Sequence, residues 1–87
     1  MTEMLIKQYI SRMTFKDIDD FARQYGIVLK NNEIEILYNH IKSDWRTILY
    51  GNPRGILDNV RNEIDPLTYS KIEQLYIYFK DKYKDYL

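Results

Sequence analysis

Four helix-start signals divide this 87-residue chain into short segments. They are Thr14 before Phe15, Asn31 before Asn32, Pro53 after Gly51-Asn52, and Asp65 before Pro66. Side chains of Thr, Asn and Asp accept a hydrogen bond from a free amide of the first helical turn, and proline fits the first helical position because its amide would have no partner there. Since apolar residues recur at helical spacing between the signals, the sequence predicts an all-α fold: one compact domain, residues 1–87, made of four or five short amphipathic helices.

The first two predicted helices each carry one apolar stripe. The helix over about residues 2–13 has apolar residues at spacings of three and four, namely Leu5, Ile6, Tyr9, Ile10 and Met13. The helix over residues 15–25 has a second set, namely Phe15, Ile18, Phe21, Ala22 and Tyr25. Gly26 follows it, and glycine readily adopts the left-handed conformation that often ends a helix. We expect each stripe to face the core.

Three more helical segments follow. After Asn31 one face carries Ile34, Leu37, Tyr38, Ile41 and Trp45, and residues 44–50 either extend this helix or follow a bend near Ser43-Asp44. Pro53 to Ile64 forms the next predicted helix, with Ile56, Val60 and Ile64 on one face. From Asp65 a long helix is predicted to reach the C-terminus, and its stripe is Thr68, Tyr69, Ile72, Leu75, Tyr76, Phe79, Tyr83 and Tyr86.

The amino-acid composition indicates how the domain is stabilised and in which compartment the protein is expected. Cysteine is absent, so the domain is expected to hold by packing, without disulfides or zinc–thiolate sites. No apolar run approaches the roughly 20 residues of a membrane span, and the N-terminus lacks the pattern of a signal peptide. We therefore expect a cytoplasmic protein that does not enter a membrane. The nine tyrosines have A/T-rich codons, so they reflect either a low-GC genome or a function.

The order of these signals resembles a known family of small helical proteins. The resemblance rests on Tyr25-Gly26-Ile27, Ile48-Leu49-Tyr50, Arg54-Gly55-Ile56-Leu57, Asp65-Pro66-Leu67-Thr68 and Leu75-Tyr76-Ile77-Tyr78-Phe79. With these segments the chain is similar to the YqfT-like family of small uncharacterised proteins from low-GC Gram-positive bacteria. The resemblance implies an all-helical fold and a bacterial cytoplasmic setting. It implies no activity and no functional residues.

Reactive residues do not converge in a pattern that predicts an enzyme. His40 is the only histidine, and Asp44 one turn later is expected to form a solvated pair with it. The aspartates at 17, 19 and 20 lack the spacing of a calcium loop. The loop Gly51–Gly55 lacks the spacing of a P-loop, so a helix stop and restart explains it better than phosphate binding. We predict a non-enzymatic protein with no metal and no cofactor.

Charge weighs against a nucleic-acid binder. The chain has 13 basic and 13 acidic residues, with six of each sign in residues 1–43 and seven of each in 44–87. A helix-turn-helix reading fails because Glu33 and Glu35 would lie where its second helix approaches phosphate. The alternative nucleic-acid surface is Trp45, Arg46, Arg54 and Arg61. Asp58 is four residues after Arg54 and three before Arg61, so ion pairs along the helix would also account for two of the arginines.

Apolar residues outside the main stripes predict a contact surface for another protein. Ile77 and Tyr78 lie off the stripe of the last helix, among charged and polar residues, and Ile36 lies off the stripe of the third. Tyrosine suits such surfaces because it combines a large apolar ring with a polar tip. The leading functional prediction is therefore a protein–protein interaction or regulatory adaptor module. It docks a partner, or a second copy of itself, through Ile77, Tyr78 and Ile36.

Overall fold

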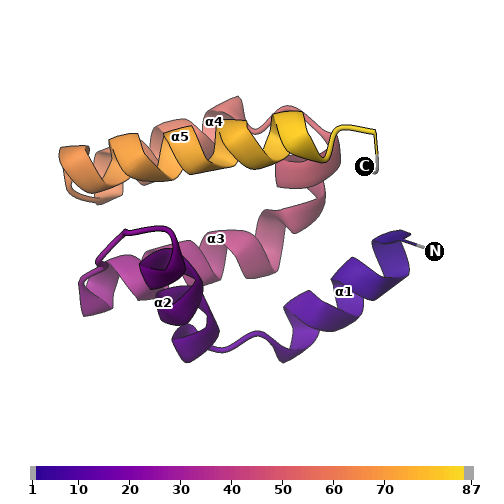
Figure 1. Ribbon diagram of the computed structural model, residues 1–87, viewed down its shortest axis with the longest axis horizontal. Coiled ribbons are helices and arrows are strands. Elements are labelled where there is room, and N and C mark those ends of the chain that lie inside the picture. The colour runs from indigo at the N-terminus through magenta and orange to yellow at the C-terminus, as the bar shows by residue number, and fades with distance from the viewer. Residues whose placement is uncertain (1, 86–87) are drawn as a thin grey trace.

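The computed structural model of the protein describes residues 2–85, and all its regular elements in that range are helices. The five helices are α1 (Thr2–Arg12), α2 (Phe15–Gln24), α3 (Asn31–Tyr50), α4 (Arg54–Glu63) and α5 (Pro66–Lys82). Figure 1 shows α4 and α5 side by side on one side of α3, with α1 and α2 on the other. The predicted all-α class is confirmed.

Local sequence signals account for both ends of α2. The Thr14 hydroxyl accepts a hydrogen bond from the Asp17 amide at 3.2 Å, and the Asp17 carboxylate accepts one from the Thr14 amide at 2.9 Å. This reciprocal pair satisfies two amides that the helix itself cannot. At the other end, Gly26 has a φ of +77°, the left-handed conformation predicted for it.

The start and the bend of α3 differ in how well the sequence predicted them. Asn31 was predicted to cap the helix, but the cap position is Lys30 and Asn31 is already helical. The carboxylate of Glu33 accepts a hydrogen bond from the Lys30 amide at 2.8 Å, and this bond holds Lys30 at the position before the first helical turn. Asp44 has non-helical angles of φ −127° and ψ 17°, so residues 44–50 continue in helical form after a bend at the predicted place.

The turn between α4 and α5 follows its sequence signals closely. The Asp65 carboxylate accepts hydrogen bonds from the Leu67 and Thr68 amides at 3.1 and 3.2 Å, and Pro66 opens α5. The helix ends at Lys82 with Tyr83 as its C-cap, short of the predicted extension to the C-terminus. Tyr86 of the predicted stripe is outside the described residues.

The core consists of two clusters that share neighbours. The larger cluster is made of Met13, Ile18, Ala22, Ile27, Leu29 and Ile34. The smaller is made of Val60, Ile64 and Tyr69. Leu37 and Ile72 pack against both clusters, so α3 and α5 join them into one core. The connector before α3 contributes Ile27 and Leu29 to this core, while Val28 between them is exposed.

The predicted stripe of α1 is buried only in part. Met13 just beyond the helix is buried, and Ile6 and Ile10 are partly buried. Leu5 and Tyr9 are 66% and 63% exposed, so the expectation that the whole stripe faces the core is wrong for them. The physical reason is that α1 packs chiefly against α3 and lies at an edge of the molecule (Figure 1), which leaves one side of its stripe without a neighbour.

Candidate functional site

An apolar groove opens between α1, α2, α3 and α5. Its volume is about 300 Å³. The residues that line it are Tyr9, Ile10, Met13, Asp17, Ile18, Phe21, Ala22, Ile27, Leu29, Leu37, Ile41, Ile72 and Leu75. Asp17 is the one charged residue among them, and it makes no ion pair with a described residue. A concave apolar surface with a single polar group is a common form of binding site.

Aromatic side chains border this groove on the α2 side. Phe21 is 45% exposed, and its ring centroid lies 5.0 Å from that of Tyr25 and 5.8 Å from that of Phe79. The Phe79 ring also stacks on Tyr83, with centroids 5.8 Å apart. These contacts hold Phe21 in place despite its exposure. On the α1 side the exposed Tyr9 forms the opposite border, so both borders are apolar and accessible.

The residues predicted to form a partner surface do not form one patch. Ile77 and Tyr78 are 57% and 52% exposed, but Ile77 lines a hollow between α4 and α5, whereas Tyr78 lines another beside Tyr25 and Gly26. Ile36 is partly buried against Val60, Ile64 and Tyr69, so it lacks the exposure that a docking surface needs. The sequence placed Ile36 off its own helix stripe, but it could not show that α4 and α5 pack on that side.

The residues of the alternative nucleic-acid surface are also separated. Trp45 is buried at 7% exposure, so its ring is not available for stacking on a base. The Arg46 guanidinium lies 4.5 Å from the centre of the Trp45 ring and pairs with Glu3 at 2.8 Å. Arg54 and Arg61 are exposed and line the hollow between α4 and α5.

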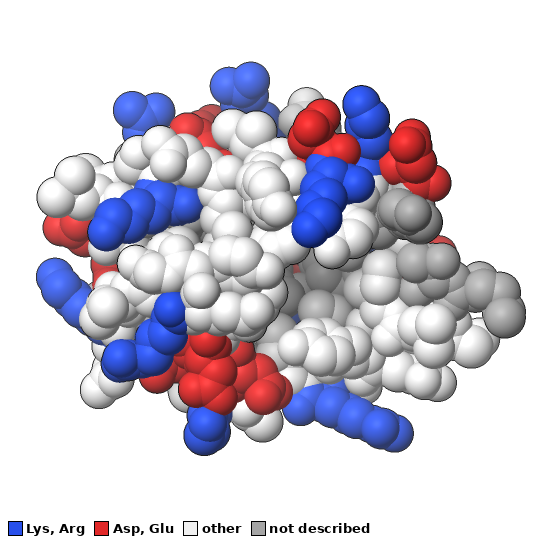
Figure 2. Space-filling model, viewed as in Figure 1, with Lys and Arg blue, Asp and Glu red and all other residues white. Residues whose placement is uncertain are grey.

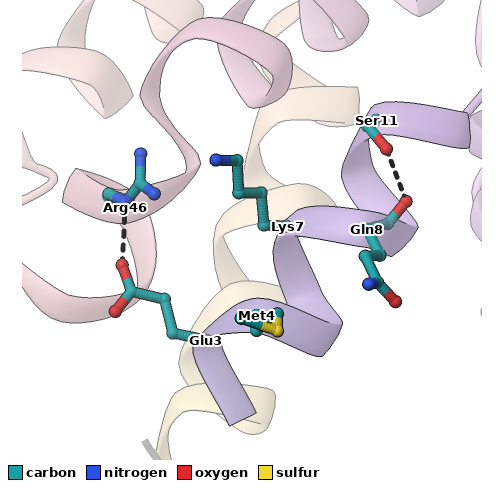
Figure 3. A pocket seen from close by; sticks show the side chains of 6 residues that line it. All are labelled: Glu3, Met4, Lys7, Gln8, Ser11 and Arg46. Atoms are coloured by element: carbon teal, nitrogen blue, oxygen red, sulfur yellow. Dashed lines mark hydrogen bonds and ion pairs between the residues drawn. The ribbon is translucent and has the colours of Figure 1, made fainter. Parts of the chain in front are cut away.

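Another hollow lies between α1 and the second half of α3, with a volume of about 620 Å³ (Figure 3). Its lining residues are Glu3, Met4, Lys7, Gln8, Ser11 and Arg46. The Arg46–Glu3 pair neutralises two of its three charges, and the Ser11 hydroxyl donates to the Gln8 carbonyl at 2.7 Å. A polar, open hollow with one remaining lysine resembles ordinary surface more than a built site.

His40 has a partner that the sequence did not indicate. The imidazole Nε2 lies 2.9 Å from a Glu63 oxygen on α4, while the predicted neighbour Asp44 is 4.0 Å from Nδ1. Because Glu63 is 23 residues away, only packing of α4 on α3 could bring it there. Within residues 2–85, no three His, Asp or Glu side chains gather as a metal site would require. Two of the three α2 aspartates pair instead with cations, Asp19 with Arg23 and Asp20 with Lys16.

Charge is mixed over the face drawn in Figure 2. Lysine and arginine side chains are spread around it, while acidic side chains gather at the lower edge, where Figure 1 places α2, and again at the upper right. No helix in the described range is long and apolar enough to cross a membrane. Comparisons with protein-family models, curated proteins and solved structures found no match. The resemblance to the YqfT-like family therefore stays a prediction.

Proposed function

We propose that this protein is a non-enzymatic interaction module that holds the apolar face of a partner's amphipathic helix in the groove between α1, α2, α3 and α5. The observation that carries the proposal is the lining of that groove, in which twelve of thirteen residues are apolar or aromatic. Five of the twelve are buried core residues that form the floor of the groove, so its accessible apolar surface lies at the borders, where Tyr9 and Phe21 are exposed. Apolar surface exposed in one place is characteristic of contact sites for other proteins. This proposal agrees with the interaction role predicted from the sequence. It differs in the docking site, which is the groove in place of Ile77, Tyr78 and Ile36.

The shape of the apolar surface favours a helix over a small molecule. Leu5 lies one helical turn before Tyr9 on the same side of α1, and Met4 beside it is 66% exposed. The apolar surface therefore continues along α1 past the end of the groove. An amphipathic helix presents side chains at spacings of three, four and seven residues, which suits an elongated surface of this kind.

Charge indicates the polar side of the partner helix. Asp17 lines the groove without a cation partner among the described residues, whereas Asp19 and Asp20 of the same helix are paired with Arg23 and Lys16. A lysine or arginine at the edge of the partner's apolar face would pair with Asp17. We therefore expect a partner helix with an aliphatic face and a basic border.

Site-specific photo-crosslinking in the native host tests this proposal. A photoreactive phenylalanine analogue at position 9 should crosslink to a protein segment that has the pattern of an amphipathic helix. The same analogue at position 67 is the matched control, because Leu67 is 76% exposed on α5 and does not line the groove. Tyr9→Lys should abolish the association and Leu67→Lys should preserve it.

Three other outcomes would overturn the proposal. Crosslinks at position 9 to a second copy of the chain would make the groove a self-association site. Crosslinks only from positions 77 and 78, with association lost in Ile77→Lys and Tyr78→Glu, would return the docking site to these two residues of α5. Crosslinks that disappear after nuclease treatment would identify a nucleic-acid complex.

A further inference from the structure

Two arginines of α4 line the hollow between α4 and α5 without an ion-pair partner among the described residues. Arg54 and Arg61 both line the space of about 270 Å³ between α4 and α5. The predicted ion pairs to Asp58 are wrong, because neither arginine comes within 4.0 Å of a described carboxylate. An exposed pair gains little energy and restricts two long side chains, which explains why helical spacing alone does not produce it. Both guanidinium groups are therefore available to a ligand.

The hollow has a different character on each wall. The α4 wall carries Arg54, Leu57, Asp58 and Arg61, whereas the α5 wall carries Tyr69, Glu73, Tyr76 and Ile77. The Glu73 carboxylate accepts a hydrogen bond from the buried Tyr69 hydroxyl at 3.0 Å. The Tyr76 hydroxyl donates to the Ile48 carbonyl at 3.0 Å. The Tyr69 bond occupies one oxygen of Glu73 and leaves its charge in the hollow. The charged groups are therefore the two guanidinium groups and the carboxylates of Asp58 and Glu73, and the exposed apolar side chain is Ile77.

The spacing of the arginines sets the length of a ligand that reaches both. Residues seven apart lie on one face of a helix, two turns or about 10 Å apart along its axis. An extended peptide rises about 3.3 Å per residue and points alternate side chains to opposite sides. Carboxylates two to four residues apart on one side of such a peptide would reach the two arginines. The apolar side chains between them would face Ile77.

A neighbouring hollow lengthens this surface. It has a volume of about 410 Å³ and shares Arg61, Tyr69 and Glu73 with the first. Pro66 and Ser70 line its far end, so the combined depression follows α4 along its length. That shape accommodates several residues of an extended chain. Arginine also suits carboxylate recognition because its planar fork donates two parallel hydrogen bonds.

We propose that the hollow between α4 and α5 binds an extended acidic peptide segment of a partner protein, with carboxylates on Arg54 and Arg61 and an aliphatic side chain on Ile77. This site is separate from the apolar groove and does not rest on it. Asp58 between the two arginines and Glu73 on the α5 wall weaken the attraction, so binding requires peptide carboxylates that reach each guanidinium directly. A polyphosphate chain would gain nothing from Ile77 and would meet the Asp58 carboxylate, so the mixed lining favours an acidic–aliphatic peptide over nucleic acid.

The test uses the full chain and a synthetic eight-residue peptide of alternating glutamate and leucine, measured by fluorescence anisotropy. Arg54→Gln and Arg61→Gln should each weaken binding about tenfold, because each removes a charge-assisted pair. Arg12→Gln changes an exposed arginine of α1 and should leave binding unchanged. Asp58→Asn should strengthen binding. All four positions are exposed, so circular dichroism should confirm that the variants keep the fold.

A second peptide isolates the role of Ile77. Ile77→Ser should weaken binding of the glutamate–leucine peptide, yet it should leave unchanged the weaker binding of a peptide in which serine replaces leucine. Three results would overturn the proposal. They are no binding of the first peptide at millimolar concentration, equal binding in Arg61→Gln and Arg12→Gln, or tighter arginine-dependent binding of a single-stranded oligonucleotide. A fourth result, loss of binding in Tyr9→Lys, would show that this site and the groove are one site, and it would also overturn the proposal.

Discussion

Helices α1 and α5 both carry an apolar stripe at helical spacing, but their surroundings differ. Ile72 of α5 packs against both core clusters, and Tyr69 one turn earlier is 7% exposed. On α1, by contrast, Leu5 and Tyr9 are 66% and 63% exposed. The amphipathic pattern is thus similar in the two helices, but neighbouring helices bury the apolar stripe of α5 to a greater extent than that of α1. A stripe identifies the side of a helix that avoids water, and the neighbouring helices decide whether that side lies in the core or on a binding surface.

The means by which the two helices are held in place also differ. The N-terminus of α5 is joined to α3 by the buried Glu33, which is 2% exposed and accepts hydrogen bonds from the amides of Lys30 and Asp65 at 2.8 and 3.1 Å. For α1, the polar contacts with α3 are the exposed pair between Glu3 and Arg46 and the bond from the Lys42 ammonium to the Ser11 carbonyl at 3.0 Å. We expect α1 to be the less firmly attached helix.

Truncation of matched side chains should give the largest difference between the two helices. Ile72→Ala removes a side chain that joins both clusters, so it should lower the free energy of unfolding by about 2–5 kcal/mol. Leu5→Ala removes an exposed side chain and should change it by less than about 0.5 kcal/mol. Urea unfolding followed by circular dichroism measures both. Equal losses would show that Leu5 is packed as firmly as Ile72.

Removal of the buried carboxylate should have the next largest effect. Glu33→Ala leaves the partly buried amides of Lys30 and Asp65 without their acceptor, which should cost about 1–3 kcal/mol. Glu35→Ala is the matched control because Glu35 is exposed in the same turn. Hydrogen exchange should also become faster at the Asp65 amide in the Glu33 variant alone. If the two variants were equally stable, Glu33 would not connect α3 to the turn before α5.

The ends of the helices show how far the sequence could predict the fold. Thr14, Gly26 and Asp65 were predicted correctly because a cap involves residues within three or four positions of one another. Lys30 was missed as a cap because its side chain is not an acceptor, and the bond at this helix start runs from its amide to the carboxylate of Glu33, three residues on. Glu33 also bonds to Asp65, 32 residues away, and periodicity carries no information about such a contact.

The candidate sites were less predictable than the helices for the same reason. The residues of the apolar groove come from four helices and two connectors, and Ile27 and Leu29 of the connector before α3 carry no helical pattern. Arg54 and Ile77 were assigned to two different functions, yet they line one hollow because α4 and α5 pack side by side. Spacing along one helix identified the exposed side chains. It could not show which of them share a surface.

Alkaline pH should act on the α5 side of the molecule. Burial, together with the hydrogen bond to Glu73, raises the pKa of Tyr69, and burial raises the pKa of Tyr76. The folded state therefore keeps these protons when the unfolded chain begins to lose them near pH 10, the ordinary tyrosine value. The unfolded state then binds fewer protons, so stability should fall as pH rises from about 10 through the raised pKa values.

Urea unfolding between pH 8 and 11.5 measures this effect. The fall in unfolding free energy above pH 10 should be smaller in Tyr69→Phe and in Tyr76→Phe, and smallest in the double variant. The comparison uses the slope with pH, so a constant loss from the missing hydroxyl does not affect it. If the unfolding free energy of the double variant fell with pH as steeply as that of the unmodified protein, groups other than Tyr69 and Tyr76 would cause the alkaline sensitivity.

The exposed ion pair between α1 and α3 should give the smallest effect, and it tests the attachment of α1 directly. The Glu3 and Arg46 side chains are 54% and 58% exposed, so water screens their attraction at 2.8 Å. A double-mutant cycle with Glu3→Gln and Arg46→Gln should give a coupling of about 0.2–1 kcal/mol that decreases with added salt. A coupling that is several times larger and indifferent to salt would mean that this pair fixes α1. In that case the apolar side of α1 would be a rigid border of the groove, and the contrast with α5 would lie in exposure alone.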